Sequence, residues 1–108
     1  MNSSNSITYT KKDVTNLVAE KLNKPVSQMK APVDAVFEAL REIMSQNHRA
    51  LRVEIRNFGV FEVKPTKAKP RARNPRTNEE VYVPPRRKSH FKPGRLLKRV
   101  LREPLDQL

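Results

Sequence analysis

The stretch Arg73-Asn74-Pro75-Arg76-Thr77-Asn78 lies in the middle of a long segment, residues 64–88, in which basic residues alternate with residues that favour strands. Asparagine followed by proline, with a second asparagine close behind, is typical of a tight turn. The segment has almost no large apolar side chains, so it cannot be part of a packed core. We therefore predict a two-stranded β-ribbon arm over about residues 64–88, with Pro75 exposed at its tip.

Four further prolines, Pro65, Pro70, Pro84 and Pro85, support this interpretation. Proline has no backbone N–H, so a strand that contains it is an edge strand, and both strands of a ribbon are edges. Because donors alternate inward and outward along a strand, the adjacent Pro84 and Pro85 must remove one inward bond. This pair predicts a break or bulge at the base of the arm. An isolated hairpin is marginal in water, so we expect the arm to be mobile until a partner orders it.

Most of the net positive charge lies in the C-terminal part of the sequence, which includes the predicted arm. Of the formal net charge of +12, residues 1–63 contribute +2 and residues 64–108 contribute +10. A polyanionic partner explains this distribution, with nucleic acid as the first candidate and an acidic membrane surface as the second. A basic surface that serves only solubility is the third interpretation. Cations would meet phosphates, and an exposed proline would offer an apolar wedge to bases.

Composition excludes several other classes of protein. The absence of cysteine excludes disulfides and thiolate zinc sites. Residues 1–9 lack the basic start and apolar core of a secretory signal, and no apolar run approaches the ~20 residues that span a bilayer. We therefore expect a cytoplasmic protein with a disordered tail over residues 1–9.

Two helices are predicted before the arm. Thr10 to Asp13 has the pattern of a capping box, and apolar residues at helical spacing continue to Leu22. A second helix is expected from near Ser27 to about Asn47. Pro32 disfavours helical geometry at the preceding residue, so we expect a distinct first turn at Ser27–Lys30.

Alternating apolar and charged residues over 51–56 predict a strand with one buried face, and Asn57-Phe58-Gly59 predicts a turn into a return strand. Pro93 is expected to open a last helix, Gly94 to about Arg102, with its apolar side chains (Leu96, Leu97, Val100 and Leu101) directed inward.

Without the arm and tail, roughly 70 residues remain, and chains of this size are commonly stabilised by oligomerisation. Phe37, Phe58 and Phe61 are candidates for a subunit interface, or alternatively fill the core of a monomer.

The order of elements and several motifs together resemble the HU and integration host factor family of bacterial DNA-bending proteins. The matching motifs are Thr10-Lys11-Lys12-Asp13, Val33-Asp34-Ala35-Val36-Phe37, Phe58-Gly59-Val60-Phe61-Glu62-Val63, Arg73-Asn74-Pro75-Arg76-Thr77 and Phe91-Lys92-Pro93-Gly94. The resemblance implies an α+β fold with a three-stranded sheet and a short C-terminal helix, in one domain over residues 10–103 followed by a tail, 104–108. It also implies an intertwined dimer, more simply of identical than of different subunits, whose arms wrap the minor groove of DNA in the nucleoid. Insertion of the proline at each tip is the established mode of this family.

Departures from the family pattern concern the turns and the arm. Glycine is usual at the positions of Asn57, Ala72 and Asn78, and asparagine is the residue that best replaces it in left-handed geometry. The stretch from Phe61 to Asn74 is one residue longer than usual, which predicts a bulge near Pro70.

The candidate functional residues follow from both arguments. Pro75 is expected to intercalate, and the DNA-binding arm is expected to use Lys64, Lys67, Lys69, Arg71, Arg73, Asn74, Arg76, Arg86, Arg87 and Lys88. A phosphate site is expected where a cation and free backbone amides meet at the last helix, at Lys92, Gly94 and Arg95. The resemblance adds Lys11 near phosphate.

Catalysis is not expected, because His48 and His90 stand apart from any carboxylate or nucleophile in a recognisable spacing, and no cofactor or metal is expected. The alternative function is a basic RNA-binding or ribosome-associated protein. Readers of RNA sequence usually stack bases on aromatic side chains, and the arm contains only Tyr82.

Overall fold

Residues 6–107 are described by a computed structural model, and the chain divides into two compact units, a helical unit (residues 1–43) and a sheet unit (residues 44–108). The predicted N-terminal tail lies partly outside the described residues. Its described part, residues 6–9, has no helix or strand and is exposed. None of the helices within residues 6–107 is long and apolar enough to cross a membrane.

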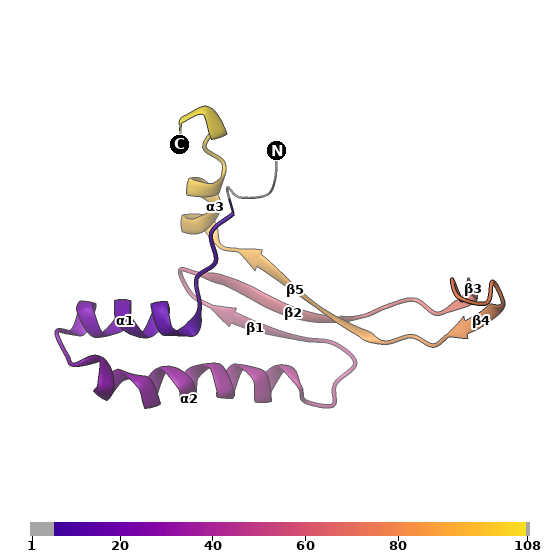
Figure 1. Ribbon diagram of the computed structural model, residues 1–108, viewed down its shortest axis with the longest axis horizontal. Coiled ribbons are helices and arrows are strands. Elements are labelled where there is room, and N and C mark those ends of the chain that lie inside the picture. The colour runs from indigo at the N-terminus through magenta and orange to yellow at the C-terminus, as the bar shows by residue number, and fades with distance from the viewer. Residues whose placement is uncertain (1–5, 108) are drawn as a thin grey trace. The chain divides into compact units, whose positions relative to one another are not determined.

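The helical unit is a hairpin of α1 (Lys11–Leu22) and α2 (Val26–Met44) (Figure 1). The predicted start of α1 is confirmed, since the Asp13 carboxylate accepts hydrogen bonds from the Thr10 N–H and hydroxyl at 2.8 and 3.1 Å. The helix ends at Asn23, which adopts left-handed geometry with φ of 53° and donates its N–H to the carbonyls of Ala19 and Glu20. Such a residue satisfies carbonyls that the last turn leaves open.

The prediction of a separate first turn before Pro32 is wrong. Helix α2 continues unbroken from Val26 through Pro32 and ends at Met44, three residues before the expected end. The missing N–H of proline removes only one helical bond. An ion pair from Lys30 to Asp34 at 3.1 Å spans the proline, and Val33 beside it is 6% exposed, so this part of the helix is held by packing that the local sequence does not reveal.

The sheet unit is built on β1 (Leu51–Ile55), β2 (Gly59–Pro65) and β5 (Arg87–Pro93), which are antiparallel in the order β1-β2-β5. The predicted strand pair and its turn are confirmed, with Asn57 at φ of 65°. The alternation predicted for residues 51–56 gives the sheet two different faces. One is apolar, and on it the rings of Phe58, Phe61 and Phe91 lie 4.8 to 6.2 Å apart.

Gly59 is required where β2 begins. A Cβ at this position would lie 2.5 Å from the carbonyl oxygen of Lys92 and 2.7 Å from the ring of Phe91, closer than real Cβ atoms approach. The close approach of β5 to β2 therefore depends on the absence of a side chain here.

The arm is a separate two-stranded sheet, β3 (Lys69–Arg73) and β4 (Glu80–Val83). The predicted bulge is confirmed, because three steps on β3 from Lys69 to Ala72 face two steps on β4. The predicted break at Pro84 and Pro85 is also present. There Thr66 holds the strands together: its N–H donates to the carbonyl of Arg86 at 2.7 Å, and its hydroxyl accepts the Arg86 N–H at 2.8 Å.

Helix α3 (Arg95–Leu101) differs from the prediction in two respects. Pro93 is the last residue of β5 and Gly94 is the N-cap, so the helix begins at Arg95. The expected inward direction is wrong for the single chain, since the side chains of Leu96, Val100 and Leu101 are exposed and only Leu97 is half-buried. A short 3₁₀ helix, η1 (Leu105–Gln107), follows.

Candidate nucleic-acid interface

The turn at the tip of the arm is held by Asn74. Its backbone N–H donates to the carbonyl of Glu79 at 2.8 Å, and its side-chain Oδ1 accepts the N–H of Arg76 at 2.9 Å. Asn78 closes the turn with left-handed geometry, φ of 60°, as predicted for an asparagine in place of glycine. Pro75 lies between these bonds and is exposed. The turn therefore presents the proline ring to solvent on a fixed backbone.

Arg73 supports this turn from the strand. Its guanidinium donates to the carbonyl of Asn78 at 2.9 Å and lies 3.7 Å from the carboxylate of Glu80. The sequence placed Arg73 beside Arg76 as an equivalent cation. In the structure Arg73 is engaged within the arm, whereas Arg76 is exposed at the tip.

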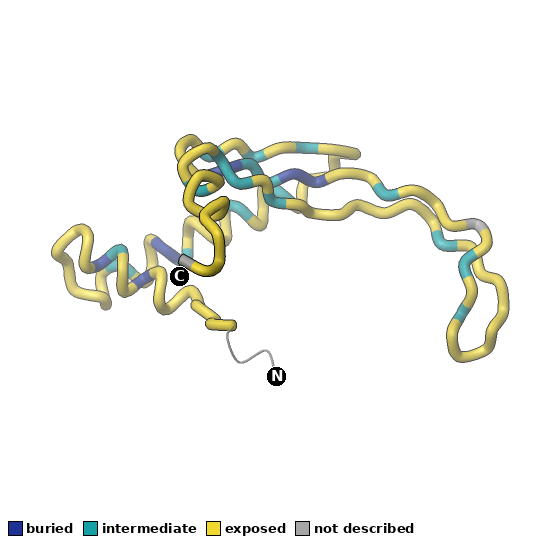
Figure 2. Tube along the Cα trace, turned by 90° about the horizontal axis from the view of Figure 1, so that it is seen from above, coloured by how far each residue is buried: buried dark blue, intermediate teal, exposed yellow. Residues whose placement is uncertain are grey.

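The other predicted cations of the arm lie on an exposed ribbon, as Figure 2 shows by the nearly continuous yellow of this segment. Exposed basic residues follow both strands and the connections to the sheet: Lys64, Lys67, Lys69, Arg71, Arg76, Arg86 and Lys88. Only Glu79 and Glu80 carry negative charge between residues 64 and 88. The arm is therefore a strongly positive element with the proline at its end.

Arg87, a predicted cation of the arm, also makes hydrogen bonds that the sequence did not indicate. Its guanidinium donates to the carbonyl oxygens of Gln46 and His48 at 2.6 and 3.1 Å. Alternation along β5 places Arg87 on the same face as Phe91, and Lys88, His90 and Lys92 on the opposite face. Arg87 thus ties the loop after α2 to the base of the arm.

The face opposite the phenylalanines is charged, and Glu62 lies at its centre. Glu62 pairs in register with Arg52 on β1 and with His90 on β5. Its carboxylate lies 3.3 Å from the Lys64 ammonium, 3.5 Å from that of Lys92 and 3.8 Å from the Arg52 guanidinium. Lys64 and Lys92 were predicted as site residues, but Arg52 and Glu62 were not. The alternation over residues 51–56 already placed Arg52 on the polar face of its strand.

The pKa of the Glu62 carboxyl reflects two opposing effects. Burial acts to raise this pKa, but the Lys64 and Lys92 ammonium groups together exceed that effect and hold the pKa below its usual value. Glu62 is therefore ionised at neutral pH despite a side chain that is only 7% exposed.

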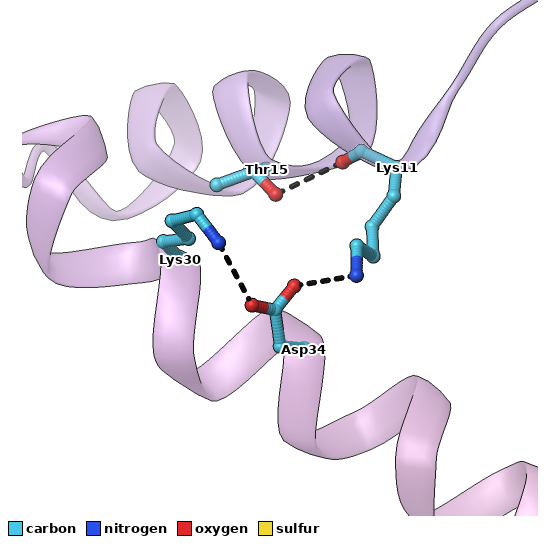
Figure 3. Close-up of polar contacts among 4 residues, drawn as sticks. All are labelled: Lys11, Thr15, Lys30 and Asp34. Atoms are coloured by element: carbon cyan, nitrogen blue, oxygen red, sulfur yellow. Dashed lines mark hydrogen bonds and ion pairs between the residues drawn. The ribbon is translucent and has the colours of Figure 1, made fainter.

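The helical unit carries a second cluster of charges around Asp34 (Figure 3). Lys11 on α1 and Lys30 on α2 reach its two carboxylate oxygens at 2.8 and 3.1 Å. Hydrogen bonds from Lys11 first, and from Lys30 second, lower the pKa of Asp34. The predicted phosphate ligand Lys11 is thus already in an ion pair, beside a pocket of about 320 Å³ that Thr15 also lines.

At the predicted phosphate site beside the last helix, two of the three residues have partners within the chain. The N–H of Gly94 donates to the carbonyl of Phe58 at 2.8 Å, so this amide is already used. Lys92 is directed to Glu62 on the sheet. Arg95 is exposed at the first position of α3.

The predicted interface residues lie in both units. Phe37 on α2 is 41% exposed and Phe58 is 45% exposed, while Phe61 is half-buried. Large apolar side chains near them in the sequence, including Val36 and Ile43, are exposed as well. Within the described residues, no group of three or more histidine and acidic side chains is placed to hold a metal ion.

Comparison with known proteins agrees with this architecture. The family described as "Bacterial DNA-binding protein" matches residues 9–102. The chain belongs to the HU and integration host factor family of bacterial DNA-binding proteins.

Relatives in this family include DNA-binding protein HU-1 of Halalkalibacterium halodurans, 36% identical over 88 residues, which cover 82% of this chain and 93% of the relative. Integration host factor subunit alpha of Marinobacter nauticus is 35% identical over 89 residues, or 82% of this chain and 85% of that protein. Among solved structures, an Anabaena HU–DNA cocrystal structure has a TM-score of 0.75 at 31% identity, covering 89% of this chain and 100% of that one. The predicted family and α+β fold are confirmed.

Proposed function

We propose that this protein is an architectural DNA-binding protein of the bacterial nucleoid, which bends duplex DNA and has no enzymatic activity. One observation carries the proposal: an exposed Pro75, on a turn fixed by Asn74, stands at the end of a ribbon covered with cations. The likeness to an HU–DNA cocrystal structure supports it. A positive ribbon with an apolar tip fits the minor groove, where a wedge between base pairs bends the duplex.

Contacts to phosphate would supply most of the affinity. Six exposed cations of the arm suit this role best because, within residues 6–107, their side chains give no donor to a carbonyl or carboxylate, whereas Arg73 and Arg87 each use part of their donors in this way. We assign phosphate contacts to Lys67, Lys69, Arg71, Arg76, Arg86 and Lys88, and we assign bracing of the arm to Arg73 at its tip and Arg87 at its base.

The functional unit would be a dimer, most simply of two identical chains. Phe37, Phe58 and the apolar side of α3 are exposed in one chain, and few of the described residues are fully buried. Burial of these side chains against a second copy would remove apolar surface from water, the main driving force of association. Two arms from one dimer could then hold the duplex from both sides.

The test compares one duplex sequence in three forms, intact DNA, DNA with a nick and double-stranded RNA, at a single salt concentration. We expect bending of DNA, measured by energy transfer between end labels, and tighter binding to the nicked form because unstacking there costs less. Equal affinity for the RNA with no change in end-to-end distance of DNA would contradict the proposal and favour the RNA-binding alternative.

A further inference from the structure

Glu62 is unusual for a residue on the basic face of the sheet. Its side chain is 7% exposed, whereas the three cations around it are 55 to 58% exposed. A carboxylate on a surface that meets DNA repels the phosphates, so a simple sum of charges gives Glu62 an unfavourable effect on binding. The structure contains a geometric reason for its presence.

The three cations come from all three strands and meet at this one side chain. Lys64 and Lys92 approach the same carboxylate oxygen, Oε1, at 3.3 and 3.5 Å, and Arg52 approaches Oε2 at 3.8 Å. Lysine and arginine side chains can lie with their aliphatic stems along a surface while their charged heads remain partly in solvent. This explains how a charged side chain in the middle of an exposed face becomes buried.

The three cations keep hydrogen-bond donors for other anions after they pair with Glu62. An ammonium group has three N–H donors and a guanidinium has five, so each retains donors for another anion after pairing with Glu62. The nearby charges stay positive in sum, with three cations against Glu62 and the exposed Glu54, which pairs with Arg52 at 3.3 Å. Without a central carboxylate, Lys64 and Lys92 would repel each other and spread over many rotamers.

We propose that Glu62 is a positioning residue that gathers Lys64, Lys92 and Arg52 into one phosphate-binding site on the sheet, separate from the arm. The inference rests on the proposed function, because it assumes that DNA supplies the phosphate. Ordering long side chains before the ligand arrives removes an entropy cost that binding would otherwise carry. Glu62 stays ionised while it does this, since the lysines hold its pKa low.

Glu54 offers a matched control on the same face. Alternation places Glu54, two residues from Arg52 on β1, on the side of the sheet that carries Glu62. Its side chain is 69% exposed and its ion pair is with Arg52 alone among the described contacts. Glu54→Gln and Glu62→Gln therefore make the same change in net charge on the same surface, but only the second removes the group between the lysines.

The experiment measures affinity for one duplex DNA over a series of salt concentrations for the wild type and both variants. Glu54→Gln should tighten binding slightly, because one negative charge is lost. Glu62→Gln should weaken binding by about three- to tenfold, as ordering of the freed side chains is then paid at binding. Its salt dependence should also flatten, by up to about one phosphate contact. Equal tightening in both variants would overturn the inference.

A double-mutant cycle separates positioning from general stability. Lys92→Gln should weaken binding in the wild type and have a clearly smaller effect in the Glu62→Gln background, because Lys92 is no longer directed. A purely structural role of Glu62 would lower the melting temperature and leave the effect of Lys92→Gln on affinity unchanged, which contradicts positioning.

If Glu62→Gln does not fold, the same question is answered by Lys64→Gln, Lys92→Gln and their combination. Because both lysines depend on one carboxylate, their effects on the logarithm of affinity should be non-additive, whereas additive effects would overturn the shared site. Failure of the wild type to bind duplex DNA would instead reject the proposed function itself, so the two failures are distinguishable.

Discussion

The β3–β4 arm and the β1–β2–β5 sheet are both antiparallel and both basic, but they hold their cations in different ways. On the arm most cations are exposed, and the ion pair between Arg73 and Glu80, the one found among the described residues of β3 and β4, braces the turn. On the sheet the cations converge on the buried Glu62. The sheet is thus ordered by packing and ion pairs before it meets a ligand, whereas the arm relies on charge and on the geometry of its tip.

The sheet and the arm should differ most in how strongly a change of one methyl group alters the stability of the fold. Gly59→Ala places a Cβ 2.5 Å from the Lys92 carbonyl, so β5 must move away from β2. We expect a loss of roughly 3 kcal/mol or more in the free energy of unfolding.

Ala72→Gly on the arm is the control, because it adds no atoms and changes a half-exposed ribbon position. Its effect on the melting temperature, measured by circular dichroism, should be small. Similar melting temperatures for the wild type and Gly59→Ala would show that the β2–β5 contact is not tightly packed.

Association of two chains should depend on the helices and the three-stranded sheet, and not on the β3–β4 arm. Phe37 on α2 and Tyr82 on β4 are both exposed aromatic residues, at 41 and 62%. Phe37→Ala should raise the dimer dissociation constant about tenfold or more, because a buried aromatic side chain contributes several kcal/mol to an interface. Tyr82→Ala should leave it unchanged.

Sedimentation equilibrium over a range of protein concentrations measures both constants. Melting temperatures of the wild type should also rise with concentration, as for any protein stabilised by self-association. A compact, stable monomer at micromolar concentration would contradict the dimer.

Acid should weaken the fold through three carboxyl groups of the helices and the three-stranded sheet. The pKa values of Asp13, Asp34 and Glu62 are all held below their usual values, by the hydrogen bonds from Thr10, by Lys11 and Lys30, and by the lysines that outweigh burial, respectively. A carboxyl group with a lowered pKa in the folded state stabilises the fold above its unfolded-state pKa, ~4, and this contribution is lost as pH falls through the folded-state pKa.

We therefore expect the melting temperature to fall as the pH decreases below about 4. Asp34→Asn should start from a lower melting temperature at pH 7 and lose less of it on acidification. The same fall in wild type and Asp34→Asn would show that the ion pairs with Lys11 and Lys30 do not contribute.

Much of this architecture could be predicted from the sequence, because the arm and the turns depend on local chemistry. Pro84 and Pro85 predicted the break, and Asn57 and Asn78 predicted left-handed turns, since proline restricts the backbone and asparagine tolerates left-handed geometry wherever they occur. Pro32 was misjudged for the opposite reason: the helix around it is held by packing, such as the burial of Val33, which a local preference does not include.

The candidate site was predicted as a list of cations but not as a set of contacts. Nothing local distinguishes Arg71 from Arg87, yet Arg87 bonds to carbonyls about forty residues away in the chain, which only the paired strands bring close. Glu62 was overlooked because a single carboxylate on a strand is ordinary in sequence, and the three cations around it come from three different strands.

Arg71 and Arg87 allow a contribution to DNA affinity to be compared with a contribution to the stability of the fold. Arg71→Ala removes an exposed cation of the arm, so it should weaken binding to all duplexes by a few fold at moderate salt and lower the salt slope by about one. Arg87→Ala should instead lower the melting temperature, because the carbonyls of Gln46 and His48 lose their donor. Equal salt slopes for Arg71→Ala and the wild type would remove Arg71 from the phosphate contacts.

The smallest effect on affinity, and the most specific effect on DNA shape, is expected at Pro75. Unstacking one base step costs a few kcal/mol, which is recovered only when the bent duplex contacts more protein. Pro75→Ala should leave affinity for straight DNA within about twofold, because the cations of the arm that provide charge-driven binding remain. The bend angle at saturation should decrease, and so should the preference for nicked DNA, where unstacking already costs little.

Were Pro75 only a turn residue, alanine would loosen the loop that Asn74 holds and lower affinity on every duplex alike. Asn74→Ala, which removes the side-chain bond to Arg76 but keeps the proline, reproduces that second pattern and serves as the matched control. Energy-transfer bend angles for the wild type and both variants decide between them, and equal angles for wild type and Pro75→Ala would mean that the proline is not the wedge.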